Sequence, residues 1–201
     1  MRLLRSDGGA YSTVNYLNWQ YTTPLVAMTY KCSNCNRDIS SSYGYWQNPE
    51  SGYIYICPEC GFPTYFDEEL GQHPGVPYGE IVKYVDDESV KALYEEARRC
   101  VSSNSYTAAV LCCRKLLMNI AVANGAKEGM KFFEYVTFLK EKGFVPPGGN
   151  EWVDTIRKKG NEATHEISIM TENDSKIIIT FVSMLLKIIY EMPNSIKELT
   201  K

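Results

Sequence analysis

Two cysteine pairs constrain this chain more than any other feature. Cys32-x-x-Cys35 and Cys57-x-x-Cys60 are separated by twenty-one residues. Each pair is short enough for both sulfurs to bind one tetrahedral ion, and this spacing is typical of a zinc ribbon. Four thiolates leave no open coordination position for water or substrate, so the sequence predicts a structural Zn²⁺ rather than a catalytic one.

Redox centres and disulfides are the other uses of such pairs. No βαβ pattern surrounds either pair, which disfavours a redox motif, and disulfides remain the main alternative to metal. Pro58 inside the second pair and Gly61 after it favour a tight turn shaped to hold sulfur. The remaining cysteines fall in helical pattern and bring the total to an odd seven, as expected in a reducing compartment: Cys100, Cys112 and Cys113.

Length and composition allow one ordinary core and one small module. The chain has 201 residues, of which 44% are hydrophobic and 22% charged, as in globular proteins. No apolar run approaches twenty residues, and the residues after Met1 lack a signal-peptide pattern. These features predict a soluble cytoplasmic protein without membrane attachment.

Composition divides the chain into four segments. Residues 1–30 are rich in Tyr, Thr and Asn and are expected to be an N-terminal extension, either an extra strand or a partner-binding arm. Residues 31–67 form the predicted zinc ribbon, whose two alternating segments carry several tyrosines. Gly and Pro are frequent in residues 68–84, which indicates a linker. Residues 85–201 have helical periodicity throughout.

The helical segment predicts five helices around one apolar element. The second of them, near residues 105–123, is apolar on nearly every side and is expected at the centre of a bundle. Thr171 and Asp174 form a capping box before the last helix, which is expected to run from about residue 173 to Glu191 because Pro193 follows. The predicted fold class is therefore mainly α, a helical bundle with a small N-terminal β zinc ribbon.

One polar stripe stands out on the fourth predicted helix. Arg157, Asn161 and His165 are spaced i, i+4 and i+8, so guanidinium, amide and imidazole could face one ligand. Phosphate suits this set, because arginine binds phosphate oxygens with two N–H groups and histidine titrates near neutrality. Arg114, on the apolar second helix, must reach water or pair with an acceptor. The alternative is structural: Asn161 and His165 only cap and tie a helix interrupted at Gly160.

Several of these segments together resemble a known family. They are Tyr94-Glu-Glu-Ala97, Tyr106-Thr-Ala-Ala-Val-Leu-Cys-Cys-Arg114, Ile156-Arg-Lys-Lys-Gly160-Asn-Glu-Ala-Thr-His165 and Leu186-Lys-Ile-Ile-Tyr-Glu-Met-Pro193. From about residue 76 to 199 the chain resembles the HEPN-like domain of unknown function found in restriction and other prokaryotic defence proteins. The resemblance implies a bundle of four or five helices, homodimerisation and kinship with RNA-cleaving HEPN domains. In those ribonucleases an Arg and a His four to six residues apart serve cleavage, whereas seven residues separate Arg157 from His165.

Charge does not favour broad phosphate binding. Basic and acidic side chains are equal in number from residue 86 onward, and residues 31–67 hold two basic against four acidic groups. Aromatic residues of the ribbon could stack bases, but in so small a module they more often form the core.

Three hypotheses follow from these patterns. The favoured one is a non-catalytic recognition or assembly module of a prokaryotic defence or restriction-type system, forming a homodimer. Its composite site of Arg114, Arg157, Asn161 and His165 would bind RNA or a nucleotide phosphate, and the alternative ligand of the module is a partner protein. The second is a metal-independent ribonuclease using His165 and Arg157 as catalytic residues. The third is a purely structural protein–protein adaptor.

Overall fold

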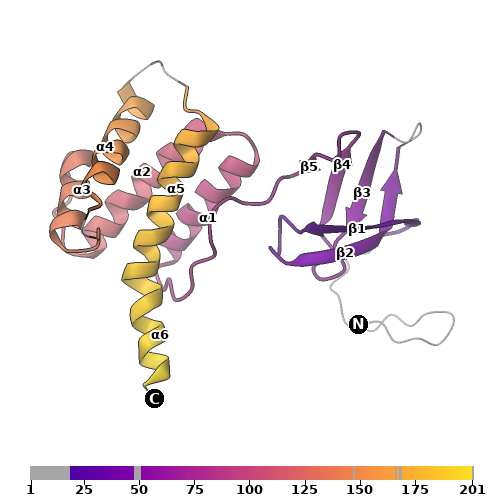
Figure 1. The fold of residues 1–201 in the computed structure, drawn as a ribbon, viewed down its shortest axis with the longest axis horizontal. Coiled ribbons are helices and arrows are strands. Elements are labelled where there is room, and N and C mark those ends of the chain that lie inside the picture. Colours follow the sequence, from indigo (N-terminus) through magenta and orange to yellow (C-terminus); the bar gives the residue numbers. More distant parts are fainter. Residues whose placement is uncertain (1–18, 48–50, 147, 166, 168, 201) are drawn as a thin grey trace. The chain divides into compact units, whose positions relative to one another are not determined.

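The computed structural model describes residues 19–47, 51–146, 148–165, 167 and 169–200. The side chains of Asn150 and His165 lie outside this description, as does the predicted extension up to residue 18. Two compact units follow one another in the chain, one ending at Val76 and one beginning at Pro77 (Figure 1). The first is an antiparallel sheet and the second is helical. The predicted fold class, mainly α with a small N-terminal β module, is confirmed.

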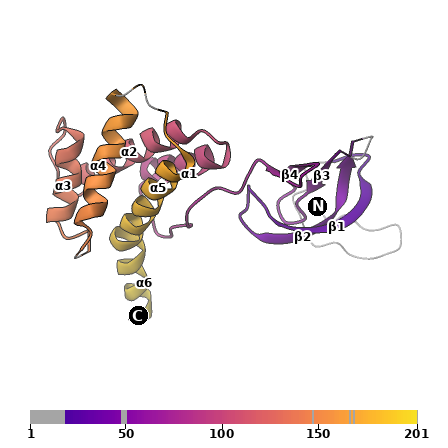
Figure 2. The same cartoon turned by 45° about the horizontal axis from the view of Figure 1, so that its top comes forward.

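Five strands make up the sheet of the first unit, in the order in which they occur in the chain. They are β1 (Thr23–Lys31), β2 (Asp38–Trp46), β3 (Gly52–Ile56), β4 (Pro63–Asp67) and β5 (Gln72–His73). Every neighbouring pair is antiparallel, and the register of β1 against β2 shifts between Pro24 and Met28. β1 and β2 curve together along their length (Figure 2). The last residues of the predicted extension thus supply a strand.

Aromatic side chains build the core of this small unit. Tyr30 lies with its ring centroid 5.1 Å from that of Phe66, and Tyr55 lies 5.8 Å from Phe66. All three are buried, together with Cys32 and Cys57. A module of this size buries little surface, so aromatic rings and cysteine side chains together form its core. Tyr43 and Trp46 remain about half exposed.

The second unit contains six α-helices and one π-helical turn among the described residues. They are α1 (Glu88–Ser102), α2 (Tyr106–Ala123), α3 (Phe132–Glu141), α4 (Asn150–His165), α5 (Glu172–Leu186), η1 (Lys187–Glu191) and α6 (Met192–Leu199). The Asp87 carboxylate accepts hydrogen bonds from the backbone of Ser89 and Val90, which fixes the start of α1. Thr171 and Asp174 cap α5 reciprocally, as their spacing predicts.

The apolar helix α2 lies at the centre of this unit. It contacts α1, α3, α4 and α5, and seven of its side chains are buried. Among the described residues, α2 is also the one helix long and apolar enough to cross a membrane. The central helix of a bundle has the same composition, and α2 has that position here.

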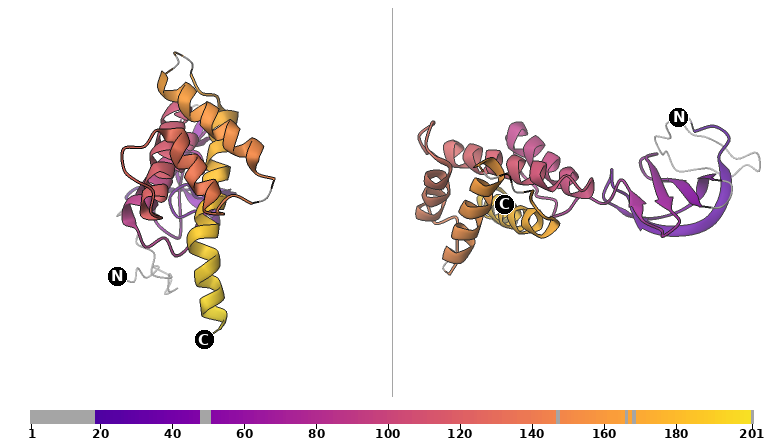
Figure 3. Two further views of the ribbon diagram at one scale, coloured as in Figure 1. Left: turned by 90° about the vertical axis from the view of Figure 1, so that its left-hand side faces the viewer. Right: turned by 90° about the horizontal axis from the view of Figure 1, so that it is seen from above.

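The last helix does not end before Pro193, so that prediction is wrong. The chain continues through η1 into α6, and α6 extends past the other helices (Figures 1 and 3). Proline lacks the N–H that would bond four residues back and its ring crowds that carbonyl. The wider π-helical turn just before Pro193 accommodates the ring, and the Asn194 side-chain amide donates to the Tyr190 carbonyl at 2.9 Å.

Residues 77–85, here called the strap, lie on the helical unit. The Arg98 guanidinium, 2% exposed, donates to the carbonyls of Tyr78 and Gly79 at 3.0 Å each and pairs with Glu95 at 2.9 Å. Gly79 has φ +86°, and a Cβ there would lie 2.7 Å from Ile179. The segment 68–84, predicted as one linker, therefore contains β5 at one end and most of the strap at the other.

Candidate functional site

The four cysteines of the two pairs come together in the first unit. The sulfurs of Cys32, Cys35, Cys57 and Cys60 all lie within 4.8 Å of one another. Cys32 Sγ is 3.7 Å from Cys60 Sγ, and Cys35 Sγ is 3.8 Å from Cys57 Sγ. A tetrahedral ion with metal–sulfur bonds of about 2.3 Å places its sulfurs about 3.8 Å apart, whereas a disulfide needs about 2.05 Å. These four cysteines could hold a metal ion, and the disulfide alternative does not fit.

The two cysteine turns have the same backbone design. In each, the N–H of the first cysteine donates to the carbonyl five residues later, and the residue four positions on donates back to the carbonyl of that cysteine, all at 2.9 Å. That fourth residue has a positive φ in both turns, 57° at Asn36 and 72° at Gly61. Asparagine and glycine tolerate this conformation best. The sequence therefore shapes both turns alike around Cys32 and Cys57.

Burial affects the thiols of the cluster unequally. It raises the pKa of Cys32 and of Cys57. Burial also acts to raise the pKa of Cys60, but the Asn34 amide, 3.5 Å from its sulfur, and the Phe62 backbone N–H lower that pKa to about 7. Buried thiols cannot all ionise without a compensating cation, whereas a bound divalent ion stabilises each thiolate and displaces its proton. The donor set thus fits a soft metal ion.

Arg114 and Asn161, two residues of the predicted ligand site, do meet. Arg114 Nη1 donates to the Gly160 carbonyl at 2.9 Å and to Asn161 Oδ1 at 3.3 Å. The guanidinium carbon lies 4.1 Å from the Phe132 ring centroid, and burial lowers the pKa of Arg114. A Cβ on Gly160 would lie 2.3 Å from Phe132 Cε1. Only glycine lets α4 approach Phe132 of α3 this closely.

Arg157 has different partners. Its Nη1 is 3.1 Å from Asp154 Oδ1, and its guanidinium carbon lies 5.5 Å from the Phe133 ring centroid. Among the described residues, no hydrogen bond joins Arg157 to Arg114 or to Asn161. The side chain of His165, the last member of the predicted site, is outside the described part of the chain.

The basic residues next to Arg157 are also paired. Lys159 Nζ lies 3.0 Å from Asp174 Oδ1 and 3.1 Å from Glu162 Oε2. These two carboxylates raise the pKa of Lys159. Lys158 Nζ lies 3.9 Å from Glu162 Oε1. The Arg-Lys-Lys cluster is therefore balanced by neighbouring acids.

An apolar groove between α4 and α5 was not predicted. Its volume is about 510 Å³, and Trp152 and Ile177 are 50% and 38% exposed on it. It is lined by Tyr78, Trp152, Thr155, Ile156, Asn173, Lys176, Ile177, Thr180, Phe181 and Met184. The sequence contains one signal for it, because Trp152 adjoins the buried Val153 and so widens the apolar stripe of α4 beyond one core-facing side.

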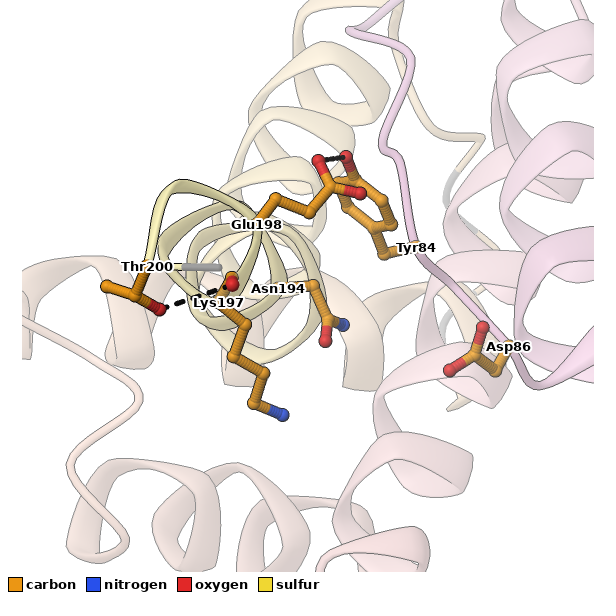
Figure 4. Close-up of a pocket in the computed structure, with 6 residues that line it drawn as sticks. All are labelled: Tyr84, Asp86, Asn194, Lys197, Glu198 and Thr200. Carbon is orange, nitrogen blue, oxygen red and sulfur yellow. Dashed lines mark hydrogen bonds between the residues drawn. The ribbon is translucent and has the colours of Figure 1, made fainter.

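A second, polar pocket of about 450 Å³ lies where the strap meets α6 (Figure 4). The Tyr84 hydroxyl donates to Glu198 Oε2 at 2.6 Å, and the Lys83 backbone N–H donates to Glu191 Oε2 at 2.9 Å. Glu198 acts to raise the pKa of Tyr84 through this hydrogen bond. The strap thus holds one side of the C-terminal helical segment.

Comparison with known proteins adds one assignment. No curated protein and no solved structure matches the chain. A family described as a domain of unknown function, DUF4145, matches residues 95–201. This range runs from the middle of α1 through α6, and it includes Arg114, Asn161 and most of the α4/α5 groove. Because the match covers more than half of the residues, the chain belongs to the DUF4145 family.

Proposed function

We propose that this protein is a non-catalytic assembly module, in which a structural Zn²⁺ stabilises the N-terminal ribbon and the helical unit binds an amphipathic helix of a protein partner. The docking site is the α4/α5 groove. The observation that carries the proposal is the exposure of Trp152 and Ile177 on an apolar groove of about 510 Å³. Exposed aromatic and aliphatic groups in a concavity mark protein-binding sites, since aromatic anchors supply most interface free energy.

The charge of the groove fits a protein ligand better than a nucleic acid. Lys176 is the charged residue of the lining. Its ammonium group pairs with Glu172 and lies 5.4 Å from the Tyr78 ring centroid. A groove with one balanced charge offers phosphate little attraction, but it can bury apolar side chains without leaving a charge unpaired.

The shape of the groove favours a helix as ligand. Residues of α4 and α5 form most of its lining, and helix-in-groove recognition places side chains at i, i+4 and i+7 between two such helices.

Zn²⁺ is the metal that four thiolates at tetrahedral spacing favour. Cys32, Cys35, Cys57 and Cys60 would hold it, and with four protein ligands it would have no position for substrate. Its contribution would be the folding free energy of a unit whose apolar core is small.

RNA or nucleotide binding at Arg114, Arg157, Asn161 and His165, and cleavage by His165 with Arg157, stay predictions. A phosphate at this place would have to compete with the Gly160 carbonyl for Arg114 and with Asp154 for Arg157. These existing partners support an assembly role over a phosphate site. The defence or restriction setting, which the family resemblance implies, also stays a prediction.

A phage-displayed library of helical peptides, selected on the zinc-loaded full chain, tests the groove. We expect selected helices to carry apolar residues at i, i+4 and i+7. Trp152→Ala should weaken their binding at least about tenfold, as for loss of a central aromatic anchor. Trp46→Ala is the matched control, because Trp46 is similarly exposed, at 48%, but belongs to the ribbon. Selected helices that bind wild type and Trp152→Ala equally would contradict the proposal.

A further inference from the structure

The C-terminal helix α6 has an apolar side that no described element covers. Met192, Ile196 and Leu199 are 57%, 61% and 88% exposed, and their spacing of i, i+4 and i+7 places them on one face. Among the described helices and strands, α6 contacts only η1. The chain thus carries both an apolar groove and an amphipathic helix with the anchor spacing that such a groove accepts.

We infer that the helix bound in the α4/α5 groove is α6 of a second copy of this chain. This inference rests on the proposed function and names its partner. A chain cannot place α6 in its own groove, because α5, η1 and α6 follow one another without a break from Glu172 to Leu199. The groove uses α5 residues between Asn173 and Met184, and α6 continues the same helical rod away from them (Figure 1).

The apolar face of α6 and the α4/α5 groove are electrostatically compatible. Ser195 and Thr200 flank the apolar face of α6, while its charged residues Lys197 and Glu198 lie on the other side of the helix. Glu198 is held there by the Tyr84 hydroxyl. The groove therefore receives an uncharged surface, and burial leaves no α6 charge without solvent or partner.

If each of two copies places its α6 in the groove of the other, the assembly is a closed dimer. Each copy offers one α6 and one groove, so a two-fold pair contains two identical contacts and leaves no copy with an open groove. The helices can exchange in this way because α6 extends past the rest of its own bundle (Figure 3).

Sedimentation velocity of the zinc-loaded full chain tests the pair. We expect a concentration-dependent dimer whose dissociation constant rises at least about tenfold in Ile196→Glu and in Ile177→Glu, because each places a charge in an apolar contact. Leu70→Glu and Leu111→Glu are matched controls for charge and exposure, at 59% and 39% exposed. Both controls should leave the dimer unchanged, and far-ultraviolet circular dichroism should report equal helix content in all four variants.

Mixing the two disrupted variants gives the decisive result. Ile196→Glu retains a wild-type groove and Ile177→Glu retains a wild-type α6, so an equimolar mixture restores one of the two contacts. We expect each variant alone to dimerise only weakly, and the mixture to form a heterodimer that is tighter than the dimer of either variant but weaker than the wild-type dimer. Packing of α6 against α6, or of groove against groove, restores nothing on mixing.

Three outcomes would overturn the inference: a wild-type chain that stays monomeric, a dimer insensitive to both substitutions, or a mixture without heterodimer. These outcomes are separable from failure of the proposed function. If Ile177→Glu abolishes binding of the selected library helices but not self-association, the groove binds a helix other than α6. If Ile177→Glu changes neither binding of these helices nor self-association, both proposals fail.

Discussion

Arg114 on α2 donates a hydrogen bond to the backbone carbonyl of Gly160 on α4, at 2.9 Å, while its guanidinium lies over the ring of Phe132 on α3. One side chain thereby joins three helices. Residue 160 has no Cβ, and this absence lets the Phe132 ring pack directly against α4. This arrangement makes Gly160 and Arg114 parts of one packing unit.

Gly160→Ala should destabilise the helical unit. The new methyl group would meet Phe132 Cε1 at 2.3 Å, and overpacking of this kind costs about 1–3 kcal/mol. Thermal unfolding followed by circular dichroism at the helix band measures the effect. Lys158→Ala, at an exposed position of the same helix, should unfold within a degree or two of wild type. Equal midpoints for Gly160→Ala and wild type would show that α4 can move away from Phe132 without cost.

Arg114→Met should lower stability by about 1–3 kcal/mol, since it removes the charged donor from the Gly160 carbonyl. Arg114→Lys should restore part of the loss at most, because lysine lacks the planar group that lies over Phe132. Urea unfolding provides the measurement, and Lys115→Met, an exposed neighbour on α2, is the control. A stable Arg114→Met variant that instead loses RNA binding would favour a ligand-binding role for this arginine.

Removal of one cysteine of the cluster should release the metal. Cys57→Ser is expected to reduce bound zinc from about one ion per chain to a small fraction, because structural sites use all four thiolates. The far-ultraviolet circular dichroism signal of the helical unit should not change. Elemental analysis after dialysis gives the stoichiometry, with Cys100→Ser, half-buried outside the cluster, as control. Full zinc retention by Cys57→Ser would remove the zinc assignment.

Acid should weaken the start of α5 through Asp174. Burial acts to raise the pKa of this carboxyl, but hydrogen bonds from Thr171 and the ion pair with Lys159 outweigh it and lower the pKa. Asp174 therefore adds stability above the unfolded-state pKa of about 3.9, and this contribution is lost as pH falls through the lower folded-state value. Asp174→Asn should cost about 1 kcal/mol at neutral pH and progressively less below about pH 4.

Thermal unfolding between neutral pH and acid checks this prediction. Asp154→Asn is the matched control, since the Asp154 side chain is 73% exposed on the surface of α4 and exposed pairs contribute little. A constant difference between wild type and Asp174→Asn at every pH would mean that the carboxylate does not act through its charge.

Labelled single-stranded RNA should remain intact in the presence of chelator and the pure protein. We expect this because Arg114 and Arg157 are engaged by Gly160 and Asp154. His165→Ala is the companion sample. Cutting by wild type that disappears in His165→Ala would support the ribonuclease hypothesis over an assembly module.

The clustering of Cys32, Cys35, Cys57 and Cys60 could be predicted because its determinants are local. Two turns with fixed cysteine spacing need only a hairpin to bring them together, and the positive φ at Gly61 follows from its residue type. The central place of α2 could also be predicted, since a helix apolar on every side must be surrounded by others.

The polar site could be predicted only in part. Helical spacing correctly placed Arg157 and Asn161 on one helix, but it could not show that Asp154 pairs with the first and Arg114 with the second. Such partners depend on how α2 and α4 pack, which periodicity alone does not determine. The α4/α5 groove was missed for the same reason.

The sequence predicts too short a C-terminal helix, because a proline normally ends an α-helix. The π-helical turn before Pro193 accommodates the proline ring, and the resulting extension carries the exposed face of α6. A proline can thus be accommodated within a continuous helical segment, here where the helix changes to π-helical hydrogen bonding just before it.

The strap affects where this protein can be dissected. A fragment cut at residue 95, where the family match begins, would keep Arg98 but discard the Tyr78 and Gly79 carbonyls that accept its hydrogen bonds. Arg98, a residue only 2% exposed in the intact chain, would then lose two of its acceptors together with the segment that covers it. The helical unit of the structure begins at Pro77, so a fragment meant to keep these contacts has to start there, upstream of the residue where the family match begins.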